Sequence, residues 1–469
     1  MKNEKGVALP AVLMVMLIIM ALSVGVVSLV RAQTKEQIYY ESNTSALHAA
    51  EAGLNQYLWN LNKEGSTPLD MGTVFYYPES NPVAAYILTD VTDGGSFKVI
   101  KSTGWRLSDP DVKRTVTSTF NKRSFTQYVY FSDNDPANIW WTSSDNCYGP
   151  YHTNTNLSVD GTPNFWKIAS YSGELVRGSG ANPTFHEGHK KLDYTIDMPE
   201  NNSELMYYAL QPDGYYFEGR TSILLKGDGT MKIWNPNYSP ATWTLPLPEN
   251  GVIYVNEKVT HNNNNKFDPN NGNVFISGVL NGRLTVAAKN DIFITGYDPT
   301  VNTFASAAVT DGVTYKDTVI TLDFVDGKPV LGDNEATLPE GAGDMLGLIA
   351  DRNVAILTYG WFDNGSVNSS RQKFKVYAAL MALEGSFINS VHFDNRNNPS
   401  FNSSYPTSNG VLTVRGSIIQ NTRGAVGFTS GTGYKKDYAH DPRMNYDQPP
   451  HFLDPEGSGW EITEWNEER

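Results

Sequence analysis

The stretch Met1–Arg31, MKNEKGVALPAVLMVMLIIMALSVGVVSLVR, determines the architecture of the whole chain. A short charged segment, MKNEKG, is followed by Val7–Val30, a run of 24 residues without a charge. A helix of that length spans about 36 Å, more than the roughly 30 Å hydrocarbon core of a bilayer. A secretory signal peptide has a shorter apolar region, followed by small residues before its cleavage site. We therefore expect this segment to stay attached to the protein as a membrane-spanning helix.

Beyond Arg31 the helical pattern continues but becomes amphipathic. Its apolar residues recur at three- and four-residue steps: Leu47, Ala50, Leu54, Leu58 and Leu61. Side chains at these steps share one helix face, so the pattern predicts a stripe that lies against a folded domain. Gly65 suits a left-handed cap, and the helix is expected to cover residues 7–63.

The residues around the apolar run resemble a known family. Lys5-Gly6 before an apolar helix resembles the site cut by prepilin peptidases, and AEAGLNQYLW (Ala50–Trp59) follows one helix-length later. Together these stretches resemble the N-terminus of type IV minor pilins of the PilX class. The resemblance implies cleavage after Gly6, which removes residues 1–6 as a leader and leaves Val7 as the mature N-terminus. A signal anchor of an unrelated surface protein is the alternative interpretation.

The fifth mature position departs from the pattern of major pilins. Major pilins carry Glu there, and its carboxylate is thought to pair with a neighbouring subunit's N-terminal amine; this chain has Ala11. Some minor pilins and tip pseudopilins also lack the Glu. The resemblance therefore implies a minor or tip subunit rather than a major one.

The composition describes a turn-rich β protein with acidic charge. The 469 residues carry a formal net charge of −14 and include 40 Gly, 25 Pro and 26 Tyr. This length predicts two or three domains, and the acidic balance argues against nucleic acid as a partner. Cys147 is the single cysteine, so no intramolecular disulfide can form, and we expect its thiol to be buried as a small apolar group.

Two β-rich regions are expected after the helix. In residues 64–125, Ala84–Thr89, Ser96–Thr103 and Val112–Phe120 alternate apolar and polar residues and are separated by Gly, Asp and Pro turns. This region resembles the small sheet that packs on the helix in pilin-like proteins. Residues 126–469 are expected to form one large β-rich head.

Recurring short strands in this second region predict a solenoid. Strands of four or five residues, separated by Gly and Asn corners, recur in four stretches: Gly251–Gly296, Asp344–Leu357, Lys375–Ile388 and Gly410–Phe428. Such repeats are typical of stacked coils, as in a parallel β-helix, in which stacking supplies the core. The side chains expected to face a common interior are Val274, Ile276, Leu284, Val286, Ile292 and Ile294. Arg283 is expected to face outward, where a substitution should be nearly silent. A β-sandwich with long loops is the alternative.

The second region also resembles a family of uncharacterised surface proteins that join a pilin-like N-terminus to a β-solenoid. The shared stretches are GPYHTN (Gly149–Asn154), SGVLNGRLTVAAKNDIFITG (Ser277–Gly296), DMLGLIADRNV (Asp344–Val354), YAALMALEGSF (Tyr377–Phe387) and YAHDPRMNYDQPPHF (Tyr438–Phe452). The resemblance implies an architecture and a surface location. It does not indicate any activity, because none is established for the family.

Candidate catalytic and metal-binding residues are expected to have simpler structural roles. The carboxylates of a carbohydrate-active solenoid would come from Asp344, Asp351, Asp133 and Asp135, with Arg352, but Asp in corners usually bonds its own backbone. His186-Glu187-Gly188-His189 is one residue short of a zinc-binding HExxH motif, so we expect no metal there. A hydrogen-bonded structural role is expected for His152. The Asn262–Asn265 run with Asp268 lacks the acidic density of a calcium loop.

Aromatic side chains are candidates for stacking on a sugar or on a partner protein, although most are expected to be core: Trp140, Trp141, Trp234, Tyr238 and Trp243.

These observations favour a mainly β protein with one long N-terminal helix, acting as a minor pilin or pilus-tip subunit in assembly, surface display or adhesion. It is expected not to be an enzyme and to need no cofactor. Its expected partners are other pilins, the assembly machinery of the cytoplasmic membrane, prepilin peptidase, and a surface glycan or protein. The precursor is expected in the cytoplasmic membrane with its head outside, and the mature protein in a filament or on the cell surface. The alternatives are a membrane-anchored β-helix carbohydrate-active enzyme and a pseudopilin of a type II-like secretion system.

Overall fold

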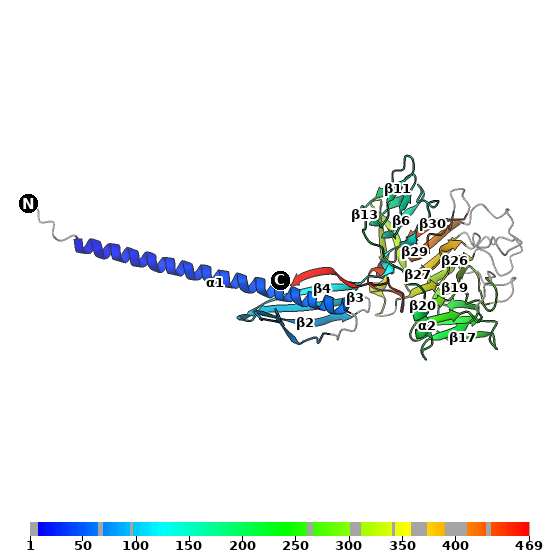
Figure 1. Ribbon diagram of the computed structural model, residues 1–469, viewed down its shortest axis with the longest axis horizontal. Coiled ribbons are helices and arrows are strands. Elements are labelled where there is room, and N and C mark those ends of the chain that lie inside the picture. Colours follow the sequence, from blue (N-terminus) through cyan, green and yellow to red (C-terminus); the bar gives the residue numbers. More distant parts are fainter. Residues whose placement is uncertain are drawn as a thin grey trace, which may run out of the picture. The chain divides into compact units, whose positions relative to one another are not determined.

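The computed structural model describes residues 8–63, 69–93, 97–259, 266–300, 311–339, 343–357, 373–389, 410–427 and 433–468. The chain divides into two compact units. Unit 1 comprises Met1–Lys122 and Gly459–Arg469, and unit 2 comprises Arg123–Ser458. Figure 1 shows one long helix in unit 1 and mostly β-structure elsewhere. The predicted fold class, mainly β with one long N-terminal helix, is confirmed.

Unit 1 is a helix packed on an antiparallel sheet. Helix α1 covers Ala8–Asn62. The sheet contains, in hydrogen-bonded order, β1 (Val74–Tyr77), β2 (Ala84–Asp93), β3 (Phe97–Arg106), β4 (Asp109–Lys122) and β31 (Trp460–Glu468). Strand β31, near the C-terminal end of the sequence, pairs with β4, whereas the sequence pattern predicts these residues in the head. In the sequence, unit 2 is therefore inserted between β4 and β31, which are neighbouring strands of the unit 1 sheet.

Small residues let the second half of α1 approach the sheet closely. Ala46, Ala49 and Ala50 are fully buried, and a Cβ atom at Gly104 of β3 would collide with the backbone of Ala46 and Ala50. Leu54 is also buried in the core of unit 1. Of the predicted stripe, Ala50 and Leu54 are therefore central, while the larger Leu47, Leu58 and Leu61 lie partly buried at its margins.

Unit 2 is a β-solenoid whose coils are stacked through parallel strand pairs on three faces. The first face contains, in hydrogen-bonded order, β13 (His189–Lys191), β10 (Ala169–Tyr171), β7 (Tyr151–Thr153), β5 (Tyr130–Asn134), β29 (Gly410–Thr422), β27 (Lys373–Ala382), β25 (Met345–Ala350), β20 (Arg283–Ala288), β18 (Val252–Asn256) and β14 (Tyr215–Glu218).

The second face contains β15 (Thr221–Lys226), β19 (Val274–Leu280), β21 (Ile292–Thr295), β26 (Val354–Leu357) and β28 (Phe387–Asn389). A separate parallel pair joins β8 (Leu157–Val159) to β11 (Leu175–Arg177). The third face contains β19, β22 (Gly312–Tyr315), β27, β29, β30 (Tyr434–Ala439), β6 (Asn146–Tyr148), β9 (Asn164–Phe165) and β12 (Thr184–Phe185). Antiparallel additions are β16 (Thr230–Trp234) and β17 (Thr242–Pro246) beside β15, and the hairpin of β23 (Ile320–Val325) and β24 (Lys328–Asp333).

Glycines occur where a strand turns from one face to the next against the neighbouring coil. Gly278 of β19 and Gly416 of β29 both have positive φ, and a Cβ at either position would overlap a carbonyl of the adjacent coil, from Leu225 or Ala378. Only glycine combines this conformation with so close a backbone approach. These contacts explain the Gly corners that recur in the sequence.

The chain enters the solenoid in the middle of the stack. It starts at β5, which pairs with β29, and proceeds coil by coil to β13; we call residues 130–191 the first run. Residues 192–214, which include α2 (Ser203–Ala209), then lead to β14 at the opposite end. The second run, residues 215–439, returns to the middle, where β30 pairs with β6. Figure 1 shows β13 and β17 at opposite ends of unit 2, with β29 between them.

The predicted interior is confirmed. Val274, Ile276, Leu284, Val286, Ile292 and Ile294 are all fully buried in one continuous core. The strands that carry them pair in parallel with neighbouring coils, as a solenoid requires and a sandwich of two antiparallel sheets does not.

A second layer covers the outer side of the first face. Residues 192–214, which we call the connecting segment, contribute Leu205 and Ala209 to this layer. Segment 444–453 contributes Met444 and Phe452. Arg283 faces outward, as predicted, and it also makes an ion pair there. Its guanidinium donates to both carboxylate oxygens of Asp447 at 2.7 and 2.8 Å and so holds segment 444–453 against the coils.

Candidate functional site

The first half of α1 is an apolar surface that unit 1 leaves uncovered. The large apolar side chains between Leu9 and Val30 are 51–73% exposed. By length and composition, α1 is the one helix among the described residues that is able to cross a membrane. Its few polar groups are satisfied within the helix, since the Ser23 and Ser28 hydroxyls donate to the carbonyls of Ile19 and Gly25. This segment is thus suited to surroundings without water.

The predicted processing residues fall at the edge of what the structure describes. Lys5, Gly6 and Val7 lie outside the described residues. Ala11 lies on the exposed first half of α1. Its side chain is a methyl group and carries no charge.

The carboxylates considered for catalysis are occupied by structural hydrogen bonds. Asp344 accepts from the backbone N–H groups of Gly282, Asp317 and Thr318 at 2.7–3.0 Å. Asp351 accepts from the Lys289 ammonium at 2.8 Å.

Other predicted site residues are likewise engaged. Asp133 accepts from the Asn154 side-chain amide at 2.7 Å. Arg352 lies 3.8 Å from Asp291. Asp268 accepts from the backbone N–H of Asn270, and Asn262–Asn265 lie outside the described residues. Among the residues that the structure describes, no three His, Cys, Asp or Glu side chains are grouped to hold a metal ion.

His186 and His189, the two histidines of the incomplete zinc motif, contact different aromatic residues. His186 stacks on Trp166 with 3.6 Å between ring centroids, whereas His189 lies 2.9 Å from the Tyr171 hydroxyl. His152 is fully buried, with Nδ1 2.8 Å from the Ser170 hydroxyl and Nε2 2.9 Å from the Asn154 side-chain oxygen. The expected structural role of His152 agrees with these contacts.

Of the predicted aromatic and thiol groups, Cys147 and Trp141 are buried, Trp234 and Trp243 are half-buried, and Tyr238 is exposed. Burial raises the pKa of the Cys147 thiol. Trp243 packs edge-on against Tyr238 at 5.4 Å, and the Arg220 guanidinium lies 4.9 Å from the Trp234 ring centroid. Trp141 is 2% exposed, so it belongs to the core rather than to the surface.

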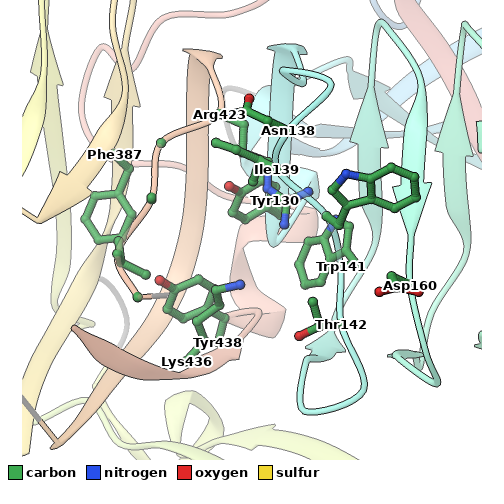
Figure 2. Close-up of a pocket in the computed structure, with 15 residues that line it drawn as sticks. Tyr130, Asn138, Ile139, Trp141, Thr142, Asp160, Phe387, Arg423, Lys436 and Tyr438 are labelled. Atoms are coloured by element: carbon green, nitrogen blue, oxygen red, sulfur yellow. The ribbon is translucent and has the colours of Figure 1, made fainter. Parts of the chain in front are cut away.

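A cavity of about 420 Å³ lies where the two runs of the solenoid meet. The first run contributes Tyr130, the loop residues 138–142 and Asp160, and the second contributes Phe387, residues 423–427, Lys436 and Tyr438. In the view of Figure 2, Phe387 and Tyr438 lie on one side, Trp141, Thr142 and Asp160 on the other, and Tyr130 and Arg423 between them.

Two ion pairs across this seam support the cavity. The Arg423 guanidinium donates to Asp135 at 3.1 Å, and both side chains are almost completely buried. Asp135 also accepts from the hydroxyls of Ser132 at 2.5 Å and Tyr151 at 3.0 Å.

The second ion pair joins Lys436 to Asp145 at 3.1 Å. Burial lowers the pKa of Lys436, and the Asp145 carboxylate opposes that effect. Both cations also lie over Trp141, Arg423 at 4.5 Å and Lys436 at 5.4 Å from its ring centroid.

Sequence reasoning identified Asp135, Trp140 and Trp141 but not their partners. Arg423 lies 288 residues from Asp135, and no local pattern links the two. A signal for such a pair would have to come from correlated changes among relatives.

Comparisons with known proteins give a family match and a structural likeness. The sequence profile of a family described as a domain of unknown function (DUF4900) matches residues 100–173, which run from β3 to β10. Among curated proteins, none matches this chain. The crystal structure of the competence-associated pilin ComZ from Thermus thermophilus aligns over 91% of this chain and 97% of that chain, with 12% identity and a TM-score of 0.28.

Proposed function

We propose that this chain is a minor or tip subunit of a type IV pilus-like filament, where α1 inserts among the helices of other pilins and unit 2 is displayed. The observation that carries the proposal is the division of α1 into two halves. The first half is apolar on every side and exposed from Leu9 to Val30, while the second is packed on the antiparallel sheet of unit 1.

The exposed half of α1 requires a partner of its own. An all-apolar helix surface is stable in lipid or among other apolar helices and unfavourable in water. A membrane-anchored precursor and a filament core each provide such surroundings in turn. Prepilin peptidase and the pilus assembly machinery of the cytoplasmic membrane are the partners that this route implies.

Ala11 and the size of the insertion support a minor rather than a major role. A methyl group at position 11 cannot neutralise an N-terminal amine inside an apolar filament, so self-assembly lacks that pairing. Unit 2, Arg123–Ser458, is a large insertion to carry on every subunit of a filament. Its two connections, after β4 and before β31, tie it to the sheet that packs on α1. Display for adhesion or for capping the filament is the role that this arrangement favours.

Processing provides the direct test. Mass spectrometry of the protein from its native membrane should find Val7 as the N-terminal residue, and Gly6→Leu should leave the intact precursor. The control is Gly25→Leu, since a side chain at Gly25 meets nothing within 4 Å and leaves the cleavage site unchanged. An intact Met1 in the native protein, or a cut near Arg31, contradicts the pilin assignment. If the chain is the dominant protein of sheared filaments, the minor role is wrong.

A further inference from the structure

The cavity between the two runs has the dimensions of a small-molecule site. Its volume of about 420 Å³ falls within the range of about 300–1,000 Å³ that such sites occupy. Its lining combines aromatic rings with a few polar side chains, the usual composition of a ligand pocket. The charges and the unpaired groups of this lining restrict the chemistry of a ligand.

The cavity offers no unbalanced positive charge to an anion. Arg423 is neutralised by Asp135, and Lys436 by Asp145. Asp160, which is exposed at the solvent side of the cavity, adds a negative charge. An acidic ligand would therefore be repelled by Asp160 and would find the two cations already engaged.

A cationic ligand is disfavoured for a different reason. An aromatic pocket attracts a cation through the negative face of a ring. Here the most deeply buried ring, Trp141, already has the Arg423 guanidinium at 4.5 Å and the Lys436 ammonium at 5.4 Å from its centroid. A third cation would meet like charges at that ring.

Three side chains of the lining have a group that is available to contact a ligand: the ring of Trp140, the amide of Asn138 and the carboxylate of Asp160. Trp140 is partly exposed; its indole N–H donates to the Ala137 carbonyl at 3.0 Å, and its ring stacks on no other aromatic ring among the described residues. Asn138 and Asp160 are exposed, and neither makes a side-chain hydrogen bond or ion pair within the described part of the chain. The cavity thus combines a free aromatic ring with a free amide and a free carboxylate.

We propose that this cavity binds a neutral saccharide. A pyranose ring presents an apolar face of C–H groups, which packs on the Trp140 ring, and its hydroxyls donate to Asp160 and exchange hydrogen bonds with Asn138. Neither an acidic nor a cationic ligand satisfies all three groups without unfavourable charge contacts. The proposal depends on unit 2 alone and holds whether or not the chain is processed as a pilin.

Calorimetry on the full chain tests the proposal, in a detergent without a sugar headgroup. The probes are methyl glycosides of glucose, galactose, mannose and N-acetylglucosamine, together with sialic acid and glucuronic acid. An array of neutral and acidic glycans shows whether longer chains bind better than single sugars. At least one neutral sugar should bind, and Trp140→Ala should weaken its binding by about tenfold or more, equal to 1.4 kcal/mol.

Matched variants separate the site from the fold. Trp465→Ala removes a tryptophan of β31 in unit 1 that is 45% exposed, and it should leave the affinity unchanged. Asp160→Asn removes the negative charge, so it should weaken binding of the neutral sugar and reduce the discrimination against acidic sugars. If no neutral sugar binds, if acidic sugars bind more tightly, or if Trp140→Ala binds like the parent protein while melting at the same temperature, the proposal is overturned.

Discussion

The two runs of the solenoid share one stack of coils but are built from different side chains. In the second run the interior is mainly aliphatic, with Leu284, Leu346 and Leu348 among its fully buried members. In the first run the interior is rich in aromatic rings, with Trp141, Tyr151 and Phe165 in mutual edge-on contact at 5.2–5.5 Å. The first run also encloses the Arg423–Asp135 ion pair, in which only the arginine comes from the second run.

The difference shows how each run obtains its stability. The aliphatic coils bury their own side chains as each coil is added. The aromatic coils depend on groups that the second run supplies last, because Arg423 and Lys436 come from the end of that run. The first run is therefore complete only when the chain closes the seam, and substitutions in the two runs should have different consequences.

The largest effect is expected in the aliphatic run. Leu284 is fully buried, and it pairs with Leu346 of the next coil. Leu284→Asp would place a carboxylate in a stack without water, and we expect a loss of more than about 4 kcal/mol in the free energy of unfolding. Hydrogen exchange of the amides of β20 and β25 in the full chain measures this loss.

Thr244→Asp is the matched control for Leu284→Asp. Thr244 is exposed on β17, so the new carboxylate stays hydrated and should change stability by less than about 0.5 kcal/mol. Arg283 is not a suitable control, because its removal also frees Asp447. Equal exchange rates in the Leu284→Asp variant and the parent protein would show that the assigned interior is wrong.

The sequence predicted the second run because its strands are long enough to show a pattern. Val274, Ile276 and Leu284 belong to strands of six or seven residues, in which the apolar positions and the Gly corners can be read directly. In the first run, β9 and β12 are two residues long, Asn164–Phe165 and Thr184–Phe185, and too short to show any periodicity. None of the four stretches that predict the solenoid lies in this run.

The two candidate sites, the apolar half of α1 and the cavity, also differ in how far the sequence predicts them. The apolar half of α1 is contiguous in sequence, so an apolar helix long enough to span a membrane could be predicted from Val7–Val30. The saccharide cavity joins residues 130–160 to residues 387–438, and the connection depends on the path of the chain through the stack. The return of β31 to unit 1 was missed for the same reason, since a strand pattern does not name its partner.

An intermediate effect is expected at the seam. Arg423→Met keeps the length of the side chain but leaves the Asp135 carboxylate buried without its counter-charge. Breaking a buried ion pair from one side typically costs about 3–5 kcal/mol. Chemical denaturation, followed by hydrogen exchange in β5 and β29, should show this loss concentrated where the two runs meet.

A double variant separates the charge from the packing. Arg423→Met with Asp135→Asn removes both charges and should recover part of the loss, because no unpaired carboxylate remains. The control pair is Lys375 and Asp311 of the second run, whose side chains are 42% and 59% exposed. Lys375→Met should cost less than about 1 kcal/mol, because both charges of this pair are hydrated. If Arg423→Met is no more harmful than Lys375→Met, the first run does not depend on closure of the seam.

The smallest effect is a change in pH dependence, carried in the first run by His152. Burial lowers the pKa of His152 below its usual 6.5, although the hydrogen bond with Asn154 and the charge of Asp133 oppose the shift. The unfolded chain therefore takes up a proton at this site more readily than the folded chain. Stability is complete above about pH 6.5, declines as the pH falls through that value and reaches its lower level below the folded pKa.

Removing His152 should make this decline shallower without abolishing it, because burial lowers the pKa of His440 in the same direction. Denaturation of the His152→Asn variant between pH 7.5 and 4.5 measures the slope, which is read separately from any overall loss of stability caused by the missing hydrogen bonds. His48→Gln, at an exposed position of α1, should leave the slope unchanged. Asn154, which contacts His152, also binds the backbone of Ile196 in the connecting segment. A slope that is identical with and without His152 would mean that protonating His152 does not destabilise the first run at this contact.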